Sequence, residues 1–206
     1  MIANLLSILI LVSATMAHGA YCSLRDPVTA IKTLYHNTNQ YRSIVAPITN
    51  KNRGSVKKLL PFTLHRSEIG KHTLYMVLDN NKPTGFVQAR SELAEWGLIE
   101  IAWGINFDMT INGLFFQRCR SPKCNQVLSN KLNNLLKDRS FKEIRSMLSE
   151  DGTKTASSIA SKFSESNDIA LLAIRSALKT IAITEIAWKK EITEITGIER
   201  IYQYPE

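Results

Sequence analysis

Between residues 60 and 117 the chain alternates short apolar runs with polar turns. The runs are rich in β-branched and aromatic residues, which is typical of strands. Because the turns between them are short, neighbouring runs are expected to pair as antiparallel hairpins. The pattern predicts a β-meander of about five strands, formed by residues 60–65, 73–78, 84–90, 98–105 and 109–117. Residues 41–48 form a further run that is compatible with a first strand.

Apolar residues recur at helical spacing on both sides of this region. Asp26 followed by Pro27 is a typical helix start, and the apolar stripe after it should pack on the sheet. Polar residues 50–58 are expected to form a loop or a short exposed helix. Later helices are predicted at residues 127–136, at residues 141–148 after the N-cap Ser140, and from about Asp168 onward, with a polar break at residues 150–158. The predicted fold class is therefore α+β, an antiparallel β-meander packed against flanking helices.

The first nineteen residues resemble a secretory signal peptide. No charged side chain precedes Arg25, and the apolar stretch from Leu5 to Val12 is shorter than the roughly 20 residues that a membrane span needs. Ala17-His18-Gly19 offers a cleavage site. We therefore expect a signal peptide at residues 1–19, then a single domain at residues 20–206 that is periplasmic or secreted. The alternatives are a buried first helix and a segment retained as an anchor.

Three cysteines, Cys22, Cys119 and Cys124, would enter an oxidising compartment if the chain is exported. Their number predicts one disulfide and one free thiol, and the sequence does not fix the pairing. The spacing of Cys119 and Cys124 is loosely compatible with zinc, but no second Cys or His pair complements them. A disulfide is the favoured interpretation.

The chain is basic, with 26 Lys and Arg against 18 Asp and Glu and a net charge of +8. A local cluster comprises Lys51, Arg53, Lys57 and Lys58. It lacks interleaved aromatic residues and any nucleic-acid-binding motif, so a nucleic acid is not the expected partner. A solvated basic face is the simplest interpretation. Such a face also suits an acidic protein partner or peripheral contact with a negatively charged membrane.

The sequence contains no conventional catalytic motif. Gly-x-Ser-x-Gly, a glycine-rich phosphate loop and His-Glu-x-x-His are all absent, so no catalytic residue and no metal site is predicted. Aromatic residues are more informative, because Trp96 precedes Gly97 at a strand entry where a planar ligand can approach the backbone. Trp103 belongs to the same aromatic set. Glu100 should lie on the opposite strand face from its apolar neighbours, in solvent or in a ligand cleft.

Four segments together resemble the FMN-binding domain family, which occurs in periplasmic subunits of Rnf and Na⁺-pumping quinone reductases and in NosR-type regulators. The pattern is a strand, a charged turn, a strand opening with glycine, a Gly-x-Ile-x-hydrophobic strand, and a strand entered through Asp-x-x-Ile-x-Gly, which ends at Gly113. It involves residues 73–79, 82–88, 97–106 and 108–114, within a stretch of about 45 residues of the chain.

The resemblance implies a flavoprotein with a role in electron transport beside a membrane redox complex. Trp96, Gly97, Trp103 and Gly113 would then lie near the isoalloxazine. The family motif Ser-Gly-Ala-Thr, whose threonine carries FMN in many members, is absent, and Thr155 is its nearest counterpart. Non-covalent FMN is therefore expected, with its phosphate near the helix start at Ser166 and near Lys162 or Lys154. The alternatives are an exported interaction module without flavin and a metal- or haem-handling protein using His65 and His72.

Overall fold

The computed structural model describes residues 23–36, 38 and 40–197. The predicted signal peptide, its cleavage site and Cys22 lie outside these residues.

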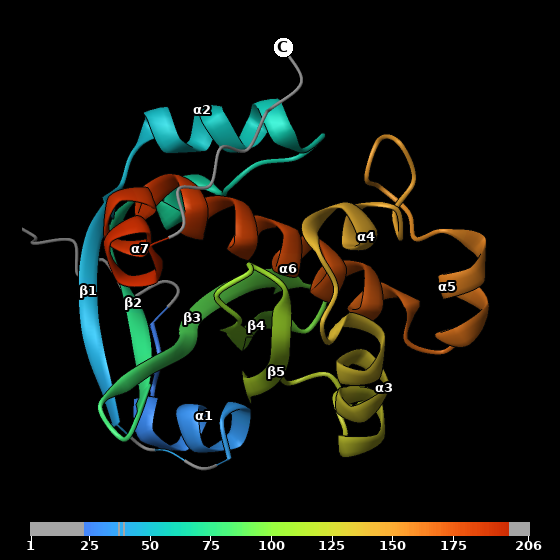
Figure 1. Cartoon of the computed structure of the whole chain (residues 1–206). Coiled ribbons are helices and arrows are strands. Elements are labelled where there is room, and N and C mark those ends of the chain that lie inside the picture. Colours follow the sequence, from blue (N-terminus) through green and yellow to red (C-terminus); the bar gives the residue numbers. More distant parts are fainter. Residues whose placement is uncertain (1–22, 37, 39, 198–206) are drawn as a thin grey trace, which may run out of the picture.

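The centre of the molecule is one antiparallel sheet whose strands follow one another in chain order (Figure 1). Every strand pairs with its neighbour in the sequence, which confirms the predicted meander and the α+β class. Its strands are β1 (Gln40–Ile48), β2 (Gly70–Asp79), β3 (Lys82–Ala94), β4 (Gly97–Ile105) and β5 (Ile111–Arg118).

Two tight turns set the register of the central hairpins. Asn80 and Asn81, both with positive φ (47° and 64°), join β2 to β3, as expected where a two-residue turn must match the strand twist. Glu95 and Trp96 join β3 to β4, since Ala94 pairs directly with Gly97. Gly97 has a φ of 95°, which an L side chain rarely adopts.

Residues 60–65 do not form a strand, contrary to the prediction. Leu60 and Leu64 are buried, so the segment has the apolar content of a strand. Its polar groups instead bond to the preceding helix, because Arg53 Nε donates to the Leu64 carbonyl (2.7 Å) and Thr63 Oγ1 donates to the Arg53 carbonyl (2.7 Å). The strand at residues 40–48 therefore completes the sheet.

Helices cover both faces of the sheet. Helix α1 (Pro27–Leu34), whose N-cap Asp26 accepts from the Thr29 amide, packs on one face, and α6 (Asn167–Ala187) crosses the other (Figure 1). Residues 50–58 are helical, because Thr49 and Asn52 form a capping box. The remaining elements are α2 (Asn50–Leu59), the 3₁₀ turn η1 (Arg66–Glu68), α3 (Gln126–Leu136), α4 (Phe141–Arg145), α5 (Ser157–Lys162) and α7 (Lys189–Thr196).

Helix α6 is joined to the sheet by two buried tryptophans as well as by apolar packing. Trp103 of β4 is fully buried and its Nε1 donates to Ser176 Oγ on α6 (3.1 Å). Trp188, at the C-terminal cap of α6, is also fully buried and donates to the carbonyl of Ile44 on β1 (3.1 Å). An indole N–H that is buried needs such a partner. Both contacts fix how α6 lies across the strands.

On the opposite face, glycines make room for Tyr35, which follows α1. Its hydroxyl lies within hydrogen-bond distance of the carbonyls of Phe86 (3.2 Å) and Ile105 (2.9 Å). A Cβ on Gly85 would lie 2.4 Å from that hydroxyl and 2.8 Å from the Ile105 carbonyl, so no larger residue fits there. Gly104 lies under the same ring. Two glycines of the family-like segments are thus explained by packing alone.

The outer edge of β5 is closed by Asn133 of α3. Its Oδ1 accepts from the Leu114 amide (2.7 Å) and its Nδ2 donates to the Leu114 carbonyl (3.1 Å). Gly113 permits this approach, because a Cβ there would be 3.0 Å from Asn133 Oδ1. A side-chain amide therefore replaces a neighbouring strand at this position, which leaves no unpaired backbone groups on Leu114.

Candidate functional site

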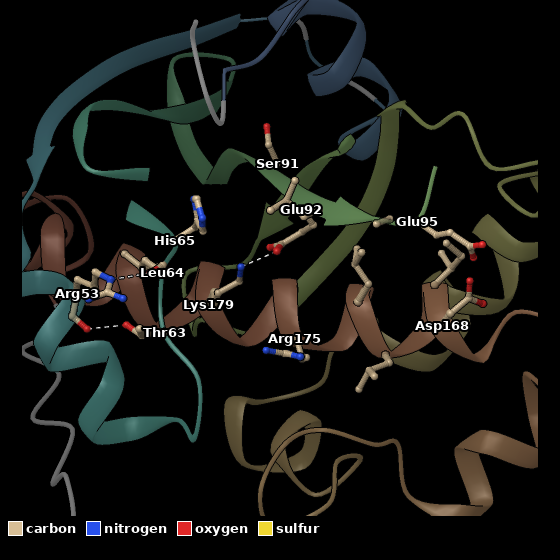
Figure 2. Close-up of a pocket in the computed structure, with 15 residues that line it drawn as sticks. Arg53, Thr63, Leu64, His65, Ser91, Glu92, Glu95, Asp168, Arg175 and Lys179 are labelled. Atoms are coloured by element: carbon tan, nitrogen blue, oxygen red, sulfur yellow. Dashed lines mark hydrogen bonds and ion pairs between the residues drawn. The ribbon is translucent and has the colours of Figure 1, made fainter. Parts of the chain in front are cut away.

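A pocket of about 550 Å³ lies between the C-terminal end of β3, the segment 63–65 and the N-terminal half of α6 (Figure 2). This volume is within the range of pockets that hold cofactor-sized ligands. Helix α6 supplies one wall through side chains that recur on one face, and the β3–β4 hairpin supplies another. The fold therefore creates a cleft where the hairpin projects past the sheet.

Charge is distributed unevenly along this pocket. Arg53, His65, Arg175 and Lys179 line one part of it, whereas Glu95 and Asp168 lie at the other end (Figure 2). Along α6 the seven residues from Asp168 to Arg175 correspond to roughly 10 Å at the usual helical rise. The pocket is thus polarised over a distance comparable to the length of a small ligand.

Apolar side chains occupy the middle of the pocket. Leu93 on β3 is 64% exposed, and Leu171 and Leu172 on α6, which are half-buried, line the same pocket. Large apolar side chains exposed next to each other in a cleft often mark a ligand surface. This part of the pocket suits a flat apolar ligand body.

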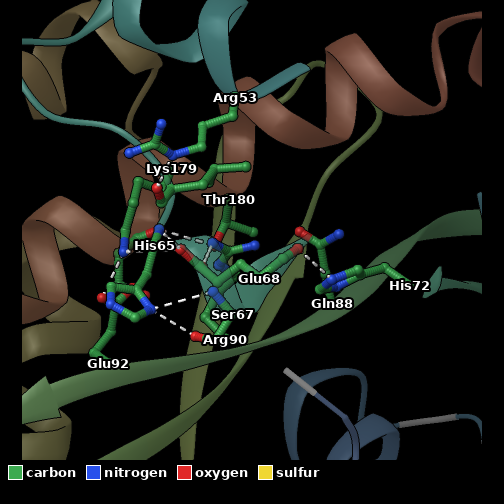
Figure 3. A network of polar contacts seen from close by, with 12 residues as sticks. Arg53, His65, Ser67, Glu68, His72, Gln88, Arg90, Glu92, Lys179 and Thr180 are labelled. Carbon is green, nitrogen blue, oxygen red and sulfur yellow. Dashed lines mark hydrogen bonds and ion pairs between the residues drawn. The ribbon is translucent and has the colours of Figure 1, made fainter. Parts of the chain in front are cut away.

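A buried cluster of charged residues forms the floor beneath Lys179 (Figure 3). The Lys179 ammonium lies 2.5 Å from a Glu92 carboxylate oxygen and 4.0 Å from Glu68 Oε2. Glu68 is also ion-paired with Arg90, and both side chains are fully buried. Two cations and two carboxylates balance one another, as burial away from water requires. The cluster ties β3 and η1 to α6 directly below the pocket.

The two histidines of interest are close to this cluster but differ in environment. His65 is exposed at the pocket, with its Nδ1 2.6 Å from Ser67 Oγ. His72 is buried on β2 and its Nε2 lies 2.7 Å from the Glu68 carbonyl, so this nitrogen carries the proton and donates it. Burial lowers the pKa of His72, because the charged imidazolium is poorly solvated there. In the described part of the chain no group of three or more His, Cys, Asp or Glu is arranged to hold a metal.

Arg175 is held in place by an aromatic ring. Its guanidinium carbon lies 4.5 Å from the centre of the Phe62 ring. Phe62 is in turn supported by the loop after α4, where Gly152, with a φ of 66°, leaves space that a Cβ would take from this ring (2.8 Å). The stack orients the guanidinium before any ligand arrives.

Two of the predicted ligand residues lie beside the pocket. Trp96 and Gly97 follow Ala94 and Glu95, which line it, and Trp96 is 54% exposed at the tip of the hairpin. Trp103 lies in the core, bonded to Ser176, and Gly113 lies against Asn133. These last two positions serve the packing described above and do not line the pocket.

The other predicted residues lie at or before the start of α6 and do not line the pocket. Thr155 is buried and its Oγ1 lies 2.7 Å from Asn167 Oδ1, which places it at the helix start. Ser166, the N-cap position, borders a smaller hollow of about 150 Å³ with Lys123 and Lys131. Lys162 is exposed on α5. The structure thus brings Thr155 and Ser166 near each other and leaves Lys162 on the surface.

Glu100 lies on the α1 face of β4, opposite its apolar neighbours, as alternation predicts. It is buried and paired with Arg25, and Arg118 Nη1 is 3.6 Å from its other oxygen. The hydrogen bond from Arg25 lowers the pKa of this carboxyl. The prediction that Glu100 lies in solvent or in a ligand cleft is therefore wrong, because its carboxylate anchors the segment before α1.

Sequence reasoning named Arg53 and His65 for other roles and missed the remaining residues that line the pocket. Arg175 and Lys179 are the usable signal, because they stand four residues apart in a helix rich in apolar residues and so share a face. Arg90 is a second signal, as a charge within the apolar run of β3. Glu68 lies in a short turn and gave no indication of burial.

A disulfide joins Cys119 to Cys124 just after β5. This confirms that a disulfide forms and fixes its pairing, which the sequence left open. Cross-links of this kind are typical of extracytoplasmic proteins. Among the residues described, no helix is both long and apolar enough to cross a bilayer. No protein-family model matches the chain, and a search among curated proteins finds no significant match.

Proposed function

We propose that this chain is an extracytoplasmic protein that binds a flavin without a covalent bond and serves as an electron-transfer or accessory component of a membrane redox system. The observation that carries the proposal is the pocket of about 550 Å³ at the end of the β3–β4 hairpin, beside Trp96 and Gly97. Its wall on the sheet side is formed by residues 91–95, which lie between two of the segments that resemble the FMN-binding domain family.

The pocket provides what a flavin needs from a protein. Leu93, Leu171 and Leu172 offer an apolar surface for the ring, and Trp96, which follows the lining residue Glu95, is exposed in the hairpin turn. Lys179 at the floor is ion-paired with Glu92, so the floor is polar but adds no net charge beneath the ring. The flavin carries the redox chemistry when bound, while the chain orients the ring and limits its contact with water. The disulfide-linked loop and the predicted signal peptide support a location outside the cytoplasm.

The test is to purify the secreted form with its disulfide intact, record its visible spectrum, and titrate it with FMN. We expect flavin absorption bands, or saturable quenching of FMN fluorescence on addition of protein. Trp96→Leu should weaken FMN binding about twofold to tenfold, because one stacked aromatic contact is lost. Val127→Ala is the matched control, since Val127 is 62% exposed on α3, outside the pocket. Protein that stays colourless and leaves FMN fluorescence unchanged would refute the proposal.

A second candidate function, a flavin-free module that docks an acidic partner, is favoured by the surface of α2. Lys51, Lys57 and Lys58 are exposed on this helix, which contains no acidic residue. Reversing Lys57 and Lys58 to Glu should abolish salt-sensitive co-sedimentation with host membranes if this face docks a membrane-bound partner. The same reversal at exposed Lys131 and Lys142 on α3 and α4 is the control. Co-sedimentation that survives the α2 reversal contradicts this function.

A further inference from the structure

The sheet forks between β2 and β3, which leaves part of β3 with a neighbouring strand on one side only. The pairing of these two strands ends at Tyr75 and Val87, whereas β3 continues to pair with β4 as far as Ala94 opposite Gly97. Among the described residues, the backbone of residues 92–94 pairs with no strand other than β4. In an antiparallel strand every second residue turns its N–H and C=O away from a given neighbour. The other side of residues 92–94 therefore offers backbone donors and acceptors for one more strand.

This open side of β3 faces the pocket. Residues 91–95 line one wall, and segment 63–65, which leads through η1 into β2, lies across from them (Figure 2). The pocket thus occupies the place that β2 would take if it stayed beside β3. The narrow part of the fork is closed by the buried ion pair between Glu68 and Arg90. Residues 92–94 are half-buried or exposed, so a ligand in the pocket can reach their backbone.

The two outer edges of the sheet are each blocked near the middle by a side chain. Asn133 bonds to both backbone groups of Leu114 on β5, and Trp188 donates to the carbonyl of Ile44 on β1. Proteins protect strand edges in such ways because an open edge pairs readily with another chain. An edge that is left open inside a cleft is typical of strand addition, in which an extended peptide joins the sheet.

The pocket has the length of a short peptide strand. Its wall on α6 runs from Asp168 to Lys179, which corresponds to about 16 Å at the usual helical rise. Its wall on β3, residues 91–95, is about 13 Å long at the usual rise of a strand. About four or five extended residues therefore fit along it.

Charges at the two ends of the pocket specify the polarity of such a peptide. Arg53 lies at one end and Glu95 at the other (Figure 2). Arg53 uses Nε to hold the Leu64 carbonyl, and no carboxylate in residues 23–36, 38 and 40–197 pairs with its guanidinium. Glu95 is exposed and has no ion pair within the same ranges. An acidic residue is therefore expected beside Arg53 and a basic residue beside Glu95.

We propose that the pocket binds an extended segment of a partner protein, which adds an antiparallel strand to β3. This orientation continues the line of β2, which runs antiparallel to β3 farther along the sheet. Because Glu95 follows β3 at its C-terminal end, the basic residue of the partner precedes the acidic one in its sequence. A peptide strand and a flavin would fill the same pocket and exclude each other, so this binding mode goes beyond the proposed function.

The probe is the pentapeptide Lys-Thr-Val-Thr-Asp, acetylated and amidated at its ends and titrated by calorimetry into the secreted form with its disulfide intact. We expect saturable binding with a dissociation constant below about 1 mM. The reversed peptide, Asp-Thr-Val-Thr-Lys, places each charge beside its like and should bind at least about threefold more weakly. Added salt should reduce the difference between the two peptides.

Peptides with a single N-methyl group test whether backbone hydrogen bonds carry the binding. Neighbouring residues of a strand point their N–H groups to opposite sides. Methylation at the second and at the third position of the peptide should therefore differ in effect. One should weaken binding about tenfold, because a hydrogen bond to β3 is lost, and the other should have little effect. Amide hydrogens of residues 92–94 that face the pocket should exchange more slowly in the complex.

The charge assignments are tested by Arg53→Gln and Glu95→Gln. Each should weaken binding of Lys-Thr-Val-Thr-Asp about twofold to fivefold, the usual value of a partly exposed ion pair. Replacing the acidic residue of the peptide by Asn should remove the difference between the wild type and Arg53→Gln. Lys142→Gln, at an exposed site on α4 outside the pocket, is the matched control and should bind as the wild type does. If circular dichroism shows that Arg53→Gln fails to fold, Glu95→Gln in the exposed turn carries the test.

Strand addition is overturned if neither peptide binds at about 2 mM, or if both methylated peptides lose affinity equally. Slower exchange elsewhere in the chain, with residues 92–94 unchanged, overturns it as well. If the wild type dimerises in sedimentation and the peptide dissociates the dimer, the occupant is a second copy of this chain and the partner segment is refuted. None of these measurements contains a flavin, so the proposed flavin function stands or fails separately.

Discussion

Neutralising Glu68 tests whether the buried charges beneath the pocket act as one balanced unit. Glu68→Gln keeps an oxygen that can accept from the His65 amide, and removes only the negative charge. Arg90 then loses the carboxylate with which it is paired, whereas Lys179 keeps its contact with Glu92. The protein should become markedly less stable, because an unbalanced charge is retained in a site without water.

The size of the effect follows from the geometry. At 4.0 Å, the distance from the Lys179 ammonium to Glu68 Oε2, two unit charges attract by about 4 kcal/mol at an effective dielectric constant of 20. Removing one member of a buried pair typically costs about 3 to 5 kcal/mol, which agrees. Since small proteins have about 5 to 15 kcal/mol of stability, Glu68→Gln should shift a urea unfolding midpoint substantially.

A double-mutant cycle makes the prediction specific. Arg90→Met alone leaves the carboxylates in excess, whereas Glu68→Gln with Arg90→Met restores a neutral cluster around Lys179 and Glu92. The double variant should therefore be more stable than the sum of the single effects predicts, by about 2 kcal/mol or more. Unfolding is followed by the fluorescence of the buried tryptophans. Effects that add to within about 0.5 kcal/mol, or a cost below about 1 kcal/mol for Glu68→Gln, would refute the reasoning. Glu194→Gln on α7, in an exposed pair, should change stability by less than about 0.5 kcal/mol.

Three further predictions concern the scaffold. Gly85→Ala should lower the free energy of unfolding in urea by about 3 kcal/mol or more, because the new Cβ meets a backbone carbonyl. Gly54→Ala in α2, where space is open, should instead raise it by about 0.5 to 1 kcal/mol. Equal effects of the two substitutions contradict this. Since the pKa of His72 is lowered in the folded state, stability should be unaffected above about pH 6.5 and fall as pH drops below it. His72→Gln should remove that slope, and an unchanged slope contradicts the assignment. Asn133→Ala should destabilise by about 2 to 4 kcal/mol and speed hydrogen exchange of the Leu114 amide; exchange as slow as in wild type counts against edge closure by Asn133.

The sheet was predictable because its information is local. Paired asparagines between β2 and β3 and the Glu-Trp-Gly turn between β3 and β4 specify hairpins from a few adjacent residues. Helix starts were predictable for the same reason: Asp26 and Ser140 each accept an amide hydrogen bond at the expected place. Residues 60–65 were not, since their apolar content fits a strand and only contact with Arg53 gives them another role.

The candidate site depends on contacts between residues distant in the sequence. Glu68, Arg90 and Lys179 span more than a hundred positions, and their charges balance only because α6 crosses the sheet above β3. Glycines in the family-like segments present the opposite problem, because the sequence suggests a binding role and the structure shows a packing role. Gly113 belongs to a family-like segment, and its small size is used to admit Asn133. A motif residue can thus serve packing, which the sequence alone does not distinguish from binding.

The order of elements along the chain has a consequence for biosynthesis. Every strand of the meander is made before α6, yet the apolar side chains of β2, β3 and β4 on that face are covered mainly by this helix. A nascent chain that ends before residue 167 therefore exposes apolar side chains on this face of the sheet. Synthesis of α6 covers these side chains and so lowers the tendency of the chain to aggregate. Chains truncated before the C-terminal end of α6 should therefore depend most strongly on chaperones.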